Sequence, residues 1–247
     1  MSQLIQTLGL SSNDIQLICF PFAGGYSASF RPLHSYLQDY CDLLVVEPPG
    51  HGTNRMPLVE SLESLVEIYL QALIPKLGKP FVLFGHSMGG LVVYRLAQKL
   101  EQQGVFPEAL IISAIQPPDI RRKAVTHLDD GAFLDYVIRI GGVPSELVKA
   151  REVLEYFLPA FKADFKALET FEHTDYTQLQ SPVHIFNGEK DGACMKEAYG
   201  WKKWVNQVRF HTFQGGHMFL LSEIEKVAET IQLILTMETA EKELIKA

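Results

Sequence analysis

The motif Gly85-His86-Ser87-Met88-Gly89 constrains the possible folds of this chain more than any other segment. It has the form G-x-S-x-G and lies between an apolar run at 80–84 and a stretch at 91–100 that is apolar on one face. These flanks predict a buried strand followed by a helix. Glycines on either side allow a turn sharp enough to expose the Ser87 hydroxyl. We therefore predict a hydrolytic nucleophile at Ser87, and the alternative is a tight structural turn.

Short apolar runs alternate with helical patterns along the chain. The runs predicted to be strands are 16–20, 43–47, 81–84, 109–114, 183–187 and 208–213. Most of them are continuously apolar, as in parallel strands that are covered on both faces. Apolar residues recur at helical spacing between them, for example in 62–73. The pattern predicts a single α/β domain over residues 1–247 with a mostly parallel, doubly wound sheet.

Residues 116–180 interrupt this alternation. The segment has no strand pattern, and we predict helical pieces at 129–140, 145–157 and 159–171, with a break before Pro159. A helical insertion between two strands is expected to form a lid over the active site. The alternative is a helical subdomain that only enlarges the core.

A serine nucleophile needs a general base that is oriented by a carboxylate. In a hydrolase built on a strand–turn–helix elbow, the order along the chain is serine, acid, histidine. Of the eight histidines, His217 is the best candidate for the base, because it lies in a glycine-rich loop after the last predicted strand. Asp191 follows the preceding predicted strand and is the preferred acid, with Asp119 and Glu189 as alternatives. These features together predict an α/β-hydrolase fold.

Acyl transfer also needs hydrogen-bond donors for a developing oxyanion. We predict the backbone N–H groups of Met88, which follows the serine, and of Ala23, in the glycine-containing loop 20–25. A plain turn is the alternative for this loop. His51, in the loop 49–52 after another predicted strand, either contacts substrate or supports the Ala23 loop, and we favour the second.

Composition excludes several other classes of protein. The 22 basic and 29 acidic residues give a net charge of −7, which argues against nucleic-acid binding. The three cysteines form no C-x-x-C motif, and no basic residue precedes Arg31. The chain also has no apolar run of membrane length. We therefore predict a cytoplasmic protein that does not bind membranes. The chain has no dinucleotide, phosphate-loop or zinc-binding motif, so no cofactor and no metal are expected.

Several segments resemble the type II thioesterases, the stand-alone enzymes that accompany nonribosomal peptide and polyketide synthetases. The matching segments are Phe20-Pro-Phe-Ala-Gly-Gly25, Pro49-Gly-His-Gly52, Gly85-His-Ser-Met-Gly-Gly90, Asn187-Gly-x-x-Asp191 and Gly215-Gly-His-Met-Phe219. The similarity extends over essentially the whole chain, including residues 116–180. No departure is evident at the catalytic positions Ser87, Asp191 and His217.

This resemblance implies hydrolysis of short acyl or misloaded aminoacyl groups from the 4′-phosphopantetheine arm of carrier domains, by a monomeric enzyme. Carrier domains are usually acidic, so the net negative charge suits them poorly unless Arg121-Arg122-Lys123 supplies local positive charge. The alternative functions are a small-molecule esterase or acyltransferase of the same fold, and a non-catalytic protein that binds carrier domains.

Overall fold

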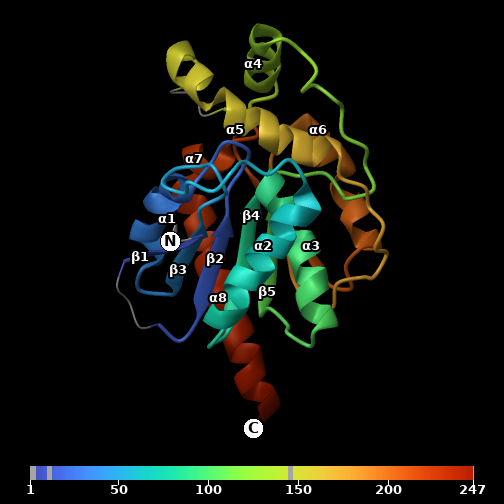
Figure 1. Cartoon of the computed structure of the whole chain (residues 1–247). Coiled ribbons are helices and arrows are strands. Elements are labelled where there is room, and N and C mark those ends of the chain that lie inside the picture. The colour runs from blue at the N-terminus through green and yellow to red at the C-terminus, as the bar shows by residue number, and fades with distance from the viewer. Residues whose placement is uncertain (1–3, 10–12, 144–146, 247) are drawn as a thin grey trace.

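The computed structural model describes residues 4–9, 13–143 and 147–246, and its centre is a seven-stranded sheet in the order β1-β3-β2-β4-β5-β6-β7 (Figure 1). The strands are β1 (Ile5–Leu8), β2 (Gln16–Phe20), β3 (Asp42–Val46), β4 (Phe81–His86), β5 (Ala109–Ser113), β6 (Val183–Gly188) and β7 (Val208–Phe213). β1 pairs antiparallel with β3, and the remaining pairs are parallel. The predicted mostly parallel, doubly wound sheet is confirmed. Strand β1, a four-residue edge strand, was not predicted.

Helices cover both faces of the sheet. They are α1 (Arg31–Leu37), α2 (Leu62–Leu73), α3 (Met88–Gln102), α4 (Asp130–Arg139), α5 (Arg151–Glu169), α6 (Gly192–Glu197), α7 (Phe219–Ser222) and α8 (Ile224–Lys246). α2 and α3 lie against one face, and α1 and α8 lie against the other (Figure 1). In the described parts of the chain, no helix combines the length and the apolarity needed to cross a bilayer.

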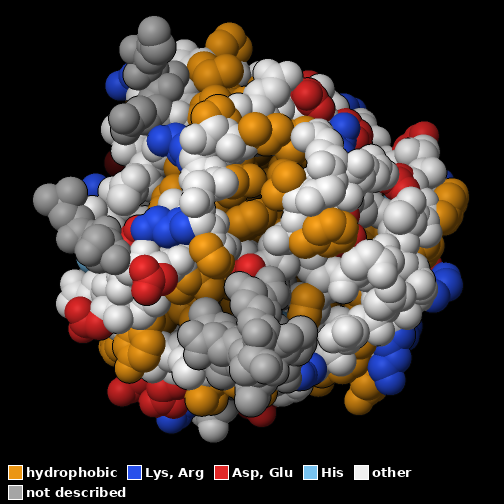
Figure 2. All heavy atoms as spheres, turned by 90° about the horizontal axis from the view of Figure 1, so that it is seen from below, with side chains coloured by type: hydrophobic (Ala, Val, Ile, Leu, Met, Phe, Trp, Pro, Cys, Tyr) orange, Lys and Arg blue, Asp and Glu red, His pale blue; other side chains and the backbone are white. Residues whose placement is uncertain are grey.

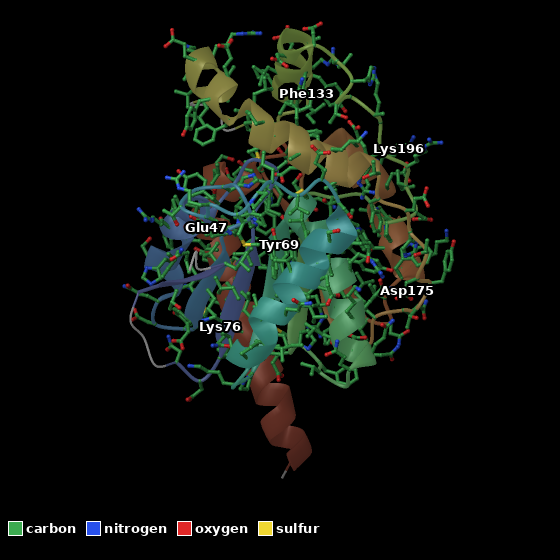
Figure 3. All side chains as sticks on the ribbon, in the orientation of Figure 1. Glu47, Tyr69, Lys76, Phe133, Asp175 and Lys196 are labelled. Atoms are coloured by element: carbon green, nitrogen blue, oxygen red, sulfur yellow. The ribbon has the colours of Figure 1, made fainter. Side chains whose placement is uncertain are left out.

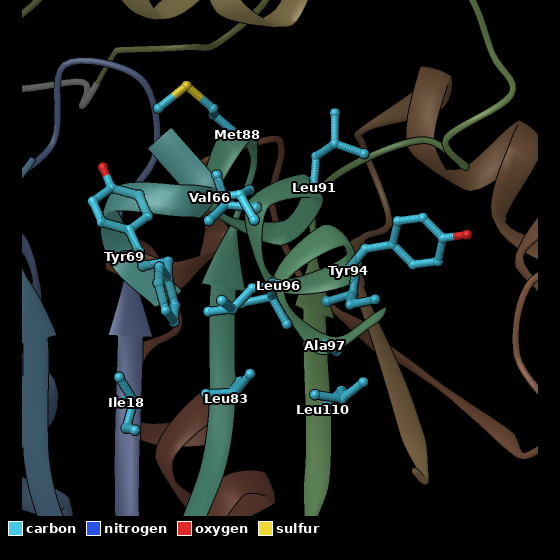
Figure 4. Close-up of a cluster of buried hydrophobic side chains, with 14 of the residues drawn as sticks. Ile18, Val66, Tyr69, Leu83, Met88, Leu91, Tyr94, Leu96, Ala97 and Leu110 are labelled. Atoms are coloured by element: carbon cyan, nitrogen blue, oxygen red, sulfur yellow. The ribbon is translucent and has the colours of Figure 1, made fainter. Parts of the chain in front are cut away.

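The two faces of the sheet form two hydrophobic clusters. On one face, Ile18, Leu83 and Leu110 pack with apolar residues of α2 and α3, as the close-up in Figure 4 shows. On the other face, Leu17 and Val82, each one residue away along its strand, pack toward α1 and α8. Full burial of each such side chain contributes about 1.5–3 kcal/mol. Continuous apolar strands are therefore what this two-sided core requires.

Helices α4 and α5 lie above the carboxyl ends of the parallel strands (Figure 1). They belong to the long connection between β5 and β6 and have a hydrophobic cluster of their own. Its residues include Phe133 (labelled in Figure 3), Leu134, Val137, Leu154 and Leu158. The connection is therefore helical, and it has a small core that is separate from the two sheet clusters.

The predicted helix break before Pro159 is wrong. Helix α5 runs without interruption from Arg151 to Glu169, with Pro159 inside it. An interior proline costs a helix about 3 kcal/mol or more, because it removes one N–H group and crowds the preceding turn. Burial of Leu154 and Leu158 against α4 offsets that cost. The helix predicted at 145–157 begins only at Arg151, and residues 144–146 lie outside the described part of the chain.

The end of the molecule opposite to α4 and α5 is seen from below in Figure 2. Hydrophobic side chains are visible near the centre of this face, and basic and acidic side chains lie mostly around them. The carboxyl ends of the parallel strands point the other way, toward α4 and α5. In open α/β sheets, ligands bind outside the carboxyl ends of the strands, and the candidate residues lie at that edge.

Candidate active site

Ser87 occupies the turn between β4 and α3 in a backbone conformation that non-glycine residues rarely adopt, with φ of 54° and ψ of −118°. A Cβ at Gly85 would lie 2.0 Å from the carbonyl oxygen of Gly89, and a Cβ at Gly89 would lie 2.1 Å from that of Phe20. Only glycine fits at these two positions. The G-x-S-x-G spacing is thus a steric requirement of the turn, which the Ser87 N–H stabilises by donating to the carbonyl of Ser113 at 2.7 Å.

The structure brings three of the predicted site residues into one hydrogen-bonded line. The Nε2 atom of His217 lies 2.9 Å from the Ser87 Oγ, and its Nδ1 lies 2.6 Å from the Oδ2 of Asp191. His217 lies in the loop between β7 and α7, and Asp191 lies in the loop between β6 and α6. With its proton on Nδ1, the imidazole donates to Asp191 and accepts from the Ser87 hydroxyl. This is the geometry in which an imidazole can remove the serine proton.

The alternative acids are not in this line. The carboxylate of Asp119 accepts hydrogen bonds from Lys203 Nζ at 2.8 Å and Trp204 Nε1 at 3.1 Å. Glu189 is exposed on the loop after β6. Asp191, in contrast, is buried and is the N-cap of α6, where its Oδ1 accepts from the N–H of Cys194 at 3.3 Å. Burial acts to raise the pKa of Asp191, but the hydrogen bonds from His217 and Cys194 outweigh it and lower that pKa below its ordinary value.

His86 lies behind His217, and sequence reasoning gave it no role. It is completely buried, and its Nε2 is 3.0 Å from the carbonyl oxygen of His217 while its Nδ1 is 2.8 Å from the Ser113 Oγ. Burial and the nearby His217 lower the pKa of His86 to about 3, so its ring is neutral. A neutral ring with its proton on Nε2 donates to His217 and accepts from Ser113, which satisfies both nitrogens and holds the backbone of the His217 loop.

Helix α5 is joined to the site by a buried ion pair. Asp164 of α5 lies 3.0 Å from the Nε2 of His51 through its Oδ2, and the same oxygen accepts from the Gly24 N–H at 2.7 Å. The other ring nitrogen of His51 lies 2.9 Å from the carbonyl oxygen of Pro49. Both nitrogens of His51 thus face acceptors, as a protonated imidazole requires. Burial acts to lower the pKa of His51, but Asp164 raises it above its ordinary value.

This geometry agrees with the interpretation that His51 stabilises the Ala23 loop, because His51 contacts Asp164 and Asp164 accepts a hydrogen bond from Gly24 in that loop. Asp164 itself was missed. The sequence does hold a signal, since Asp164 stands between Ala160, Phe161, Ala163 and Ala167 on the buried side of α5. A carboxylate on an apolar helix face needs a partner. Sequence alone does not identify that partner, which is 113 residues away.

Glu47, labelled in Figure 3, fixes the neighbouring loops. Its carboxylate accepts from the N–H groups of Ser27 and Thr53, each at 2.8 Å, and from the Thr53 hydroxyl at 3.1 Å. Burial acts to raise the pKa of Glu47, and these donors hold it below its ordinary value. The loops after β2 and β3 are therefore tied to each other beneath α5.

The two backbone N–H groups predicted as oxyanion donors have no acceptor among the described residues of the protein. Met88 is the first residue of α3, where N–H groups have no partner within the helix. Ala23 lines the same cavity as Ser87. Its loop is shaped by the turn in which the Gly25 N–H donates to Phe22. Both groups are therefore available to a ligand.

A cavity of about 370 Å³ opens beside Ser87 and His217. Phe22, Ile115 and Ile120 line it from the sheet side, and Tyr136, Ile140, Phe165 and Leu168 line it from α4, α5 and the turn after α4. Its walls are mainly apolar, with basic residues 121–123 at one side. Such a space suits a small acyl group next to the serine.

One cluster in the described part of the chain has potential metal ligands, namely Asp191, Cys194 and His217, whose ligand atoms lie within 4.8 Å of one another. Asp191 and His217 are already hydrogen-bonded to each other. Burial raises the pKa of the Cys194 thiol, which keeps it neutral, whereas metal ligation requires a thiolate. The cluster is therefore better suited to moving a proton than to holding a cation.

The α/β-hydrolase class is defined by a doubly wound sheet in which a serine occupies a strand-to-helix elbow and is hydrogen-bonded to a histidine. Residues 15–235 match the thioesterase domain family. The chain belongs to this family and is a hydrolase that acts on thioesters.

Individual relatives agree with this assignment. The probable anguibactin biosynthesis thioesterase AngT of Vibrio anguillarum is 34% identical over 97% of this chain and 100% of its own length. The probable cadicidin biosynthesis thioesterase of Streptomyces griseus is 29% identical over 93% of this chain, and the match spans 64% of that protein. The solved type II thioesterase BorB from the borrelidin biosynthetic cluster has a TM-score of 0.86 and 29% identity, covering 94% of this chain and 97% of BorB.

Proposed function

We propose that this protein removes short acyl or misloaded aminoacyl groups from the 4′-phosphopantetheine arm of carrier domains in nonribosomal peptide or polyketide synthesis. The solved type II thioesterase YbtT from the yersiniabactin NRPS/PKS pathway and ClbQ from the colibactin NRPS/PKS pathway share its fold. The observation that carries the proposal is the hydrogen-bonded line from Ser87 through His217 to Asp191, which opens on a cavity of acyl size. No resident cofactor is needed, because the substrate brings the pantetheine arm.

In the first half-reaction, the Ser87 Oγ attacks the thioester carbonyl carbon while His217 takes the hydroxyl proton. Asp191 holds the imidazole in position and stabilises its positive charge. The N–H groups of Ala23 and Met88 donate to the oxyanion that forms. When the C–S bond breaks, His217 returns the proton to the pantetheine sulfur, and an acyl ester remains on Ser87.

In the second half-reaction, water attacks the acyl ester and His217 takes one of its protons. The same two N–H groups hold the second oxyanion. Collapse of this intermediate breaks the bond to Oγ, and His217 returns the proton to Ser87. The products are a carboxylic acid and a free carrier thiol, and the enzyme is restored.

The test compares wild-type protein with Ser87→Ala on acetyl-loaded carrier domains, followed by mass spectrometry of the carrier. We expect the wild type to release the acetyl group and the variant to leave it in place while keeping its circular dichroism spectrum. Equal release by both proteins would contradict the proposal. A wild type that hydrolyses p-nitrophenyl acetate but not acetyl-carrier would instead indicate a small-molecule esterase, and a Ser87→Ala variant that keeps its cellular effect would indicate a non-catalytic binding protein.

We further propose that the enzyme is a monomer that works in the cytoplasm, where carrier domains are loaded. Three unpaired cysteines, Cys19, Cys41 and Cys194, support a reducing environment. Helices α4 and α5 would act as the lid over the acyl cavity, since they contribute part of its lining and lie above the strand ends.

A further inference from the structure

Three basic residues line the cavity beside Ser87, and among the described residues none of them is in an ion pair. They are Arg121, Arg122 and Lys123, in the connection that leaves β5. Arg121 and Lys123 are exposed, and Lys123 lies 5.9 Å from the centre of the Tyr136 ring. Water solvates both. Arg122 differs from them because its side chain turns inward.

Arg122 is poorly satisfied by the protein around it. Its Nη1 and Nη2 donate to the carbonyls of Ile120 and Gln116, each at the long distance of 3.3 Å. Its Nε is buried and has no hydrogen-bond partner. Burial lowers the pKa of Arg122 to about 10, which still leaves the guanidinium charged at neutral pH. Arg122 is only partly exposed, and a charge that is largely removed from water without a counter-ion is costly unless a ligand completes it.

The two acidic residues of the cavity, Glu169 and Asp191, bind other donors, and among the described residues neither forms an ion pair with Arg122. Glu169 accepts from the N–H groups of Val125 and Thr126 and from the Thr126 hydroxyl. Asp191 accepts from His217 and Cys194. With three basic residues against two carboxylates, the wall of the cavity carries excess positive charge, although the whole protein has a net charge of −7.

We infer that Arg122 is an anion-binding, specificity-determining residue of the acyl cavity, which pairs with a carboxylate or phosphate group of the bound thioester. Arginine suits this role because its planar fork can donate two parallel hydrogen bonds to such a group. The anion has two possible sources in one substrate: a carboxylate on the acyl chain, or the phosphate of the pantetheine arm. The inference rests on the proposed function, since both sources belong to an acyl-pantetheine substrate.

Four substrates separate the two sources: acetyl and succinyl thioesters of pantetheine, and the same two thioesters of 4′-phosphopantetheine. We expect Arg122→Gln to raise KM at least about tenfold for the substrates that carry the recognised anion, as for the loss of a charge-assisted hydrogen bond. Neutral acetyl-pantetheine should be unaffected. A selective effect on the succinyl pair indicates the carboxylate, and one on the phosphorylated pair indicates the phosphate. Arg122→Lys should restore part of the loss.

The matched control is Arg31→Gln, which removes one exposed positive charge at the start of α1. It should leave all four KM values unchanged. If Arg122→Gln also leaves them unchanged while remaining folded, the inference is wrong although the proposed function stands.

A binding measurement does not depend on turnover. Succinate or inorganic phosphate is titrated into wild type, Arg31→Gln and Arg122→Gln, with the shift in Tm as the readout. Stabilisation of the first two proteins but not of the third supports the anion site. Equal responses of all three, or none in the wild type, overturn it. A wild type that hydrolyses none of the four thioesters contradicts the proposed function, and this titration still decides the role of Arg122.

Discussion

At the scale of single residues, the site depends on the state of two neighbouring imidazoles. His217 faces Ser87 on one side and Asp191 on the other, whereas His86 is kept neutral by burial and holds the His217 backbone. One histidine is thus free to exchange a proton, and the other is committed to structure. Their separation in the sequence hides this relation, because they meet only when the β4 and β7 loops come together.

Asp191 and Asp119 provide a matched pair of substitutions. Asp191→Asn should keep the fold but lower kcat by about 10³–10⁴, because the amide no longer holds His217 in the tautomer that accepts the serine proton. Asp119→Asn should leave kcat near the wild-type value, because Asp119 is hydrogen-bonded to Lys203 and Trp204 and not to His217. Steady-state hydrolysis of an acetyl thioester measures both. The acid assignment fails if Asp119→Asn is the more damaging change.

Gly89 tests the steric basis of the elbow. In Gly89→Ala the new methyl group would meet the Phe20 carbonyl, so α3 or the end of β2 must move, at a cost of at least about 1–3 kcal/mol. Gly78→Ala is the control, because no atom lies within 4 Å of its added Cβ. Urea unfolding gives both free energies, and equal values would rule out the close approach. Activity should fall only in Gly89→Ala.

At the scale of secondary-structure elements, α5 is the least ordinary part of the fold. It carries Pro159 in its interior, Asp164 on its buried face and part of the cavity lining. Its first half packs with α4, and its last turns, with Ala167 and Leu168, pack into the sheet cluster that faces α2 and α3. The pair between Asp164 and His51 adds a buried polar attachment between these two apolar contacts.

The attachment of α5 should respond to pH. The pKa of His51 is raised in the folded protein, so its contribution to stability is complete below its unfolded pKa of about 6.5 and is lost as pH rises through the folded value. Burial lowers the pKa of His86 and His184, so their contributions change below that range. The Tm of the wild type should therefore fall as the pH is raised from about 6 to 9.

The same measurement on His51→Gln provides the control. The variant should be less stable at pH 6 and should lose most of the pH dependence above 6.5. The protection factors of the α5 amides, in which the intrinsic rise of exchange with pH is divided out, should fall with pH in the wild type only. An identical slope in both proteins would mean that another group titrates in this range.

Prediction from sequence succeeded where the information is local. The elbow glycines, the apolar strands and the loop positions of Asp191 and His217 follow from short motifs and hydrophobic periodicity. The pairs Asp164–His51 and His86–His217 join residues 113 and 131 positions apart, and no local pattern specifies them. Pro159 misled the prediction because local propensity favours a break, whereas packing of α5 against α4 prevails.

At the scale of the whole molecule, the three thiols report on global unfolding. Cys19 and Cys41 are fully buried in the cluster facing α1 and α8, and burial raises the pKa of Cys19 well above its usual value and that of Cys41 to about 12. Cys194 is also buried, with a raised pKa. Each is therefore a neutral, shielded thiol, which reacts slowly with electrophiles.

Iodoacetamide at pH 8 should leave the native protein largely unmodified and should label all three cysteines once denaturant unfolds it. Mass spectrometry of the peptides gives the rate at each site. The rates for Cys19 and Cys41 should follow the free energy of global unfolding. Rapid native labelling of either one would mean that the sheet opens locally.

The hydrogen bond from the Gly24 amide to Asp164 ties the loop that carries one proposed oxyanion donor to a helix that covers the cavity. Displacing α5 would remove the acceptor that orients this loop. A position of α5 that admits a thioester would then be incompatible with hydrolysis. The thioester could enter or leave only while the Ala23 N–H is not oriented toward the oxyanion.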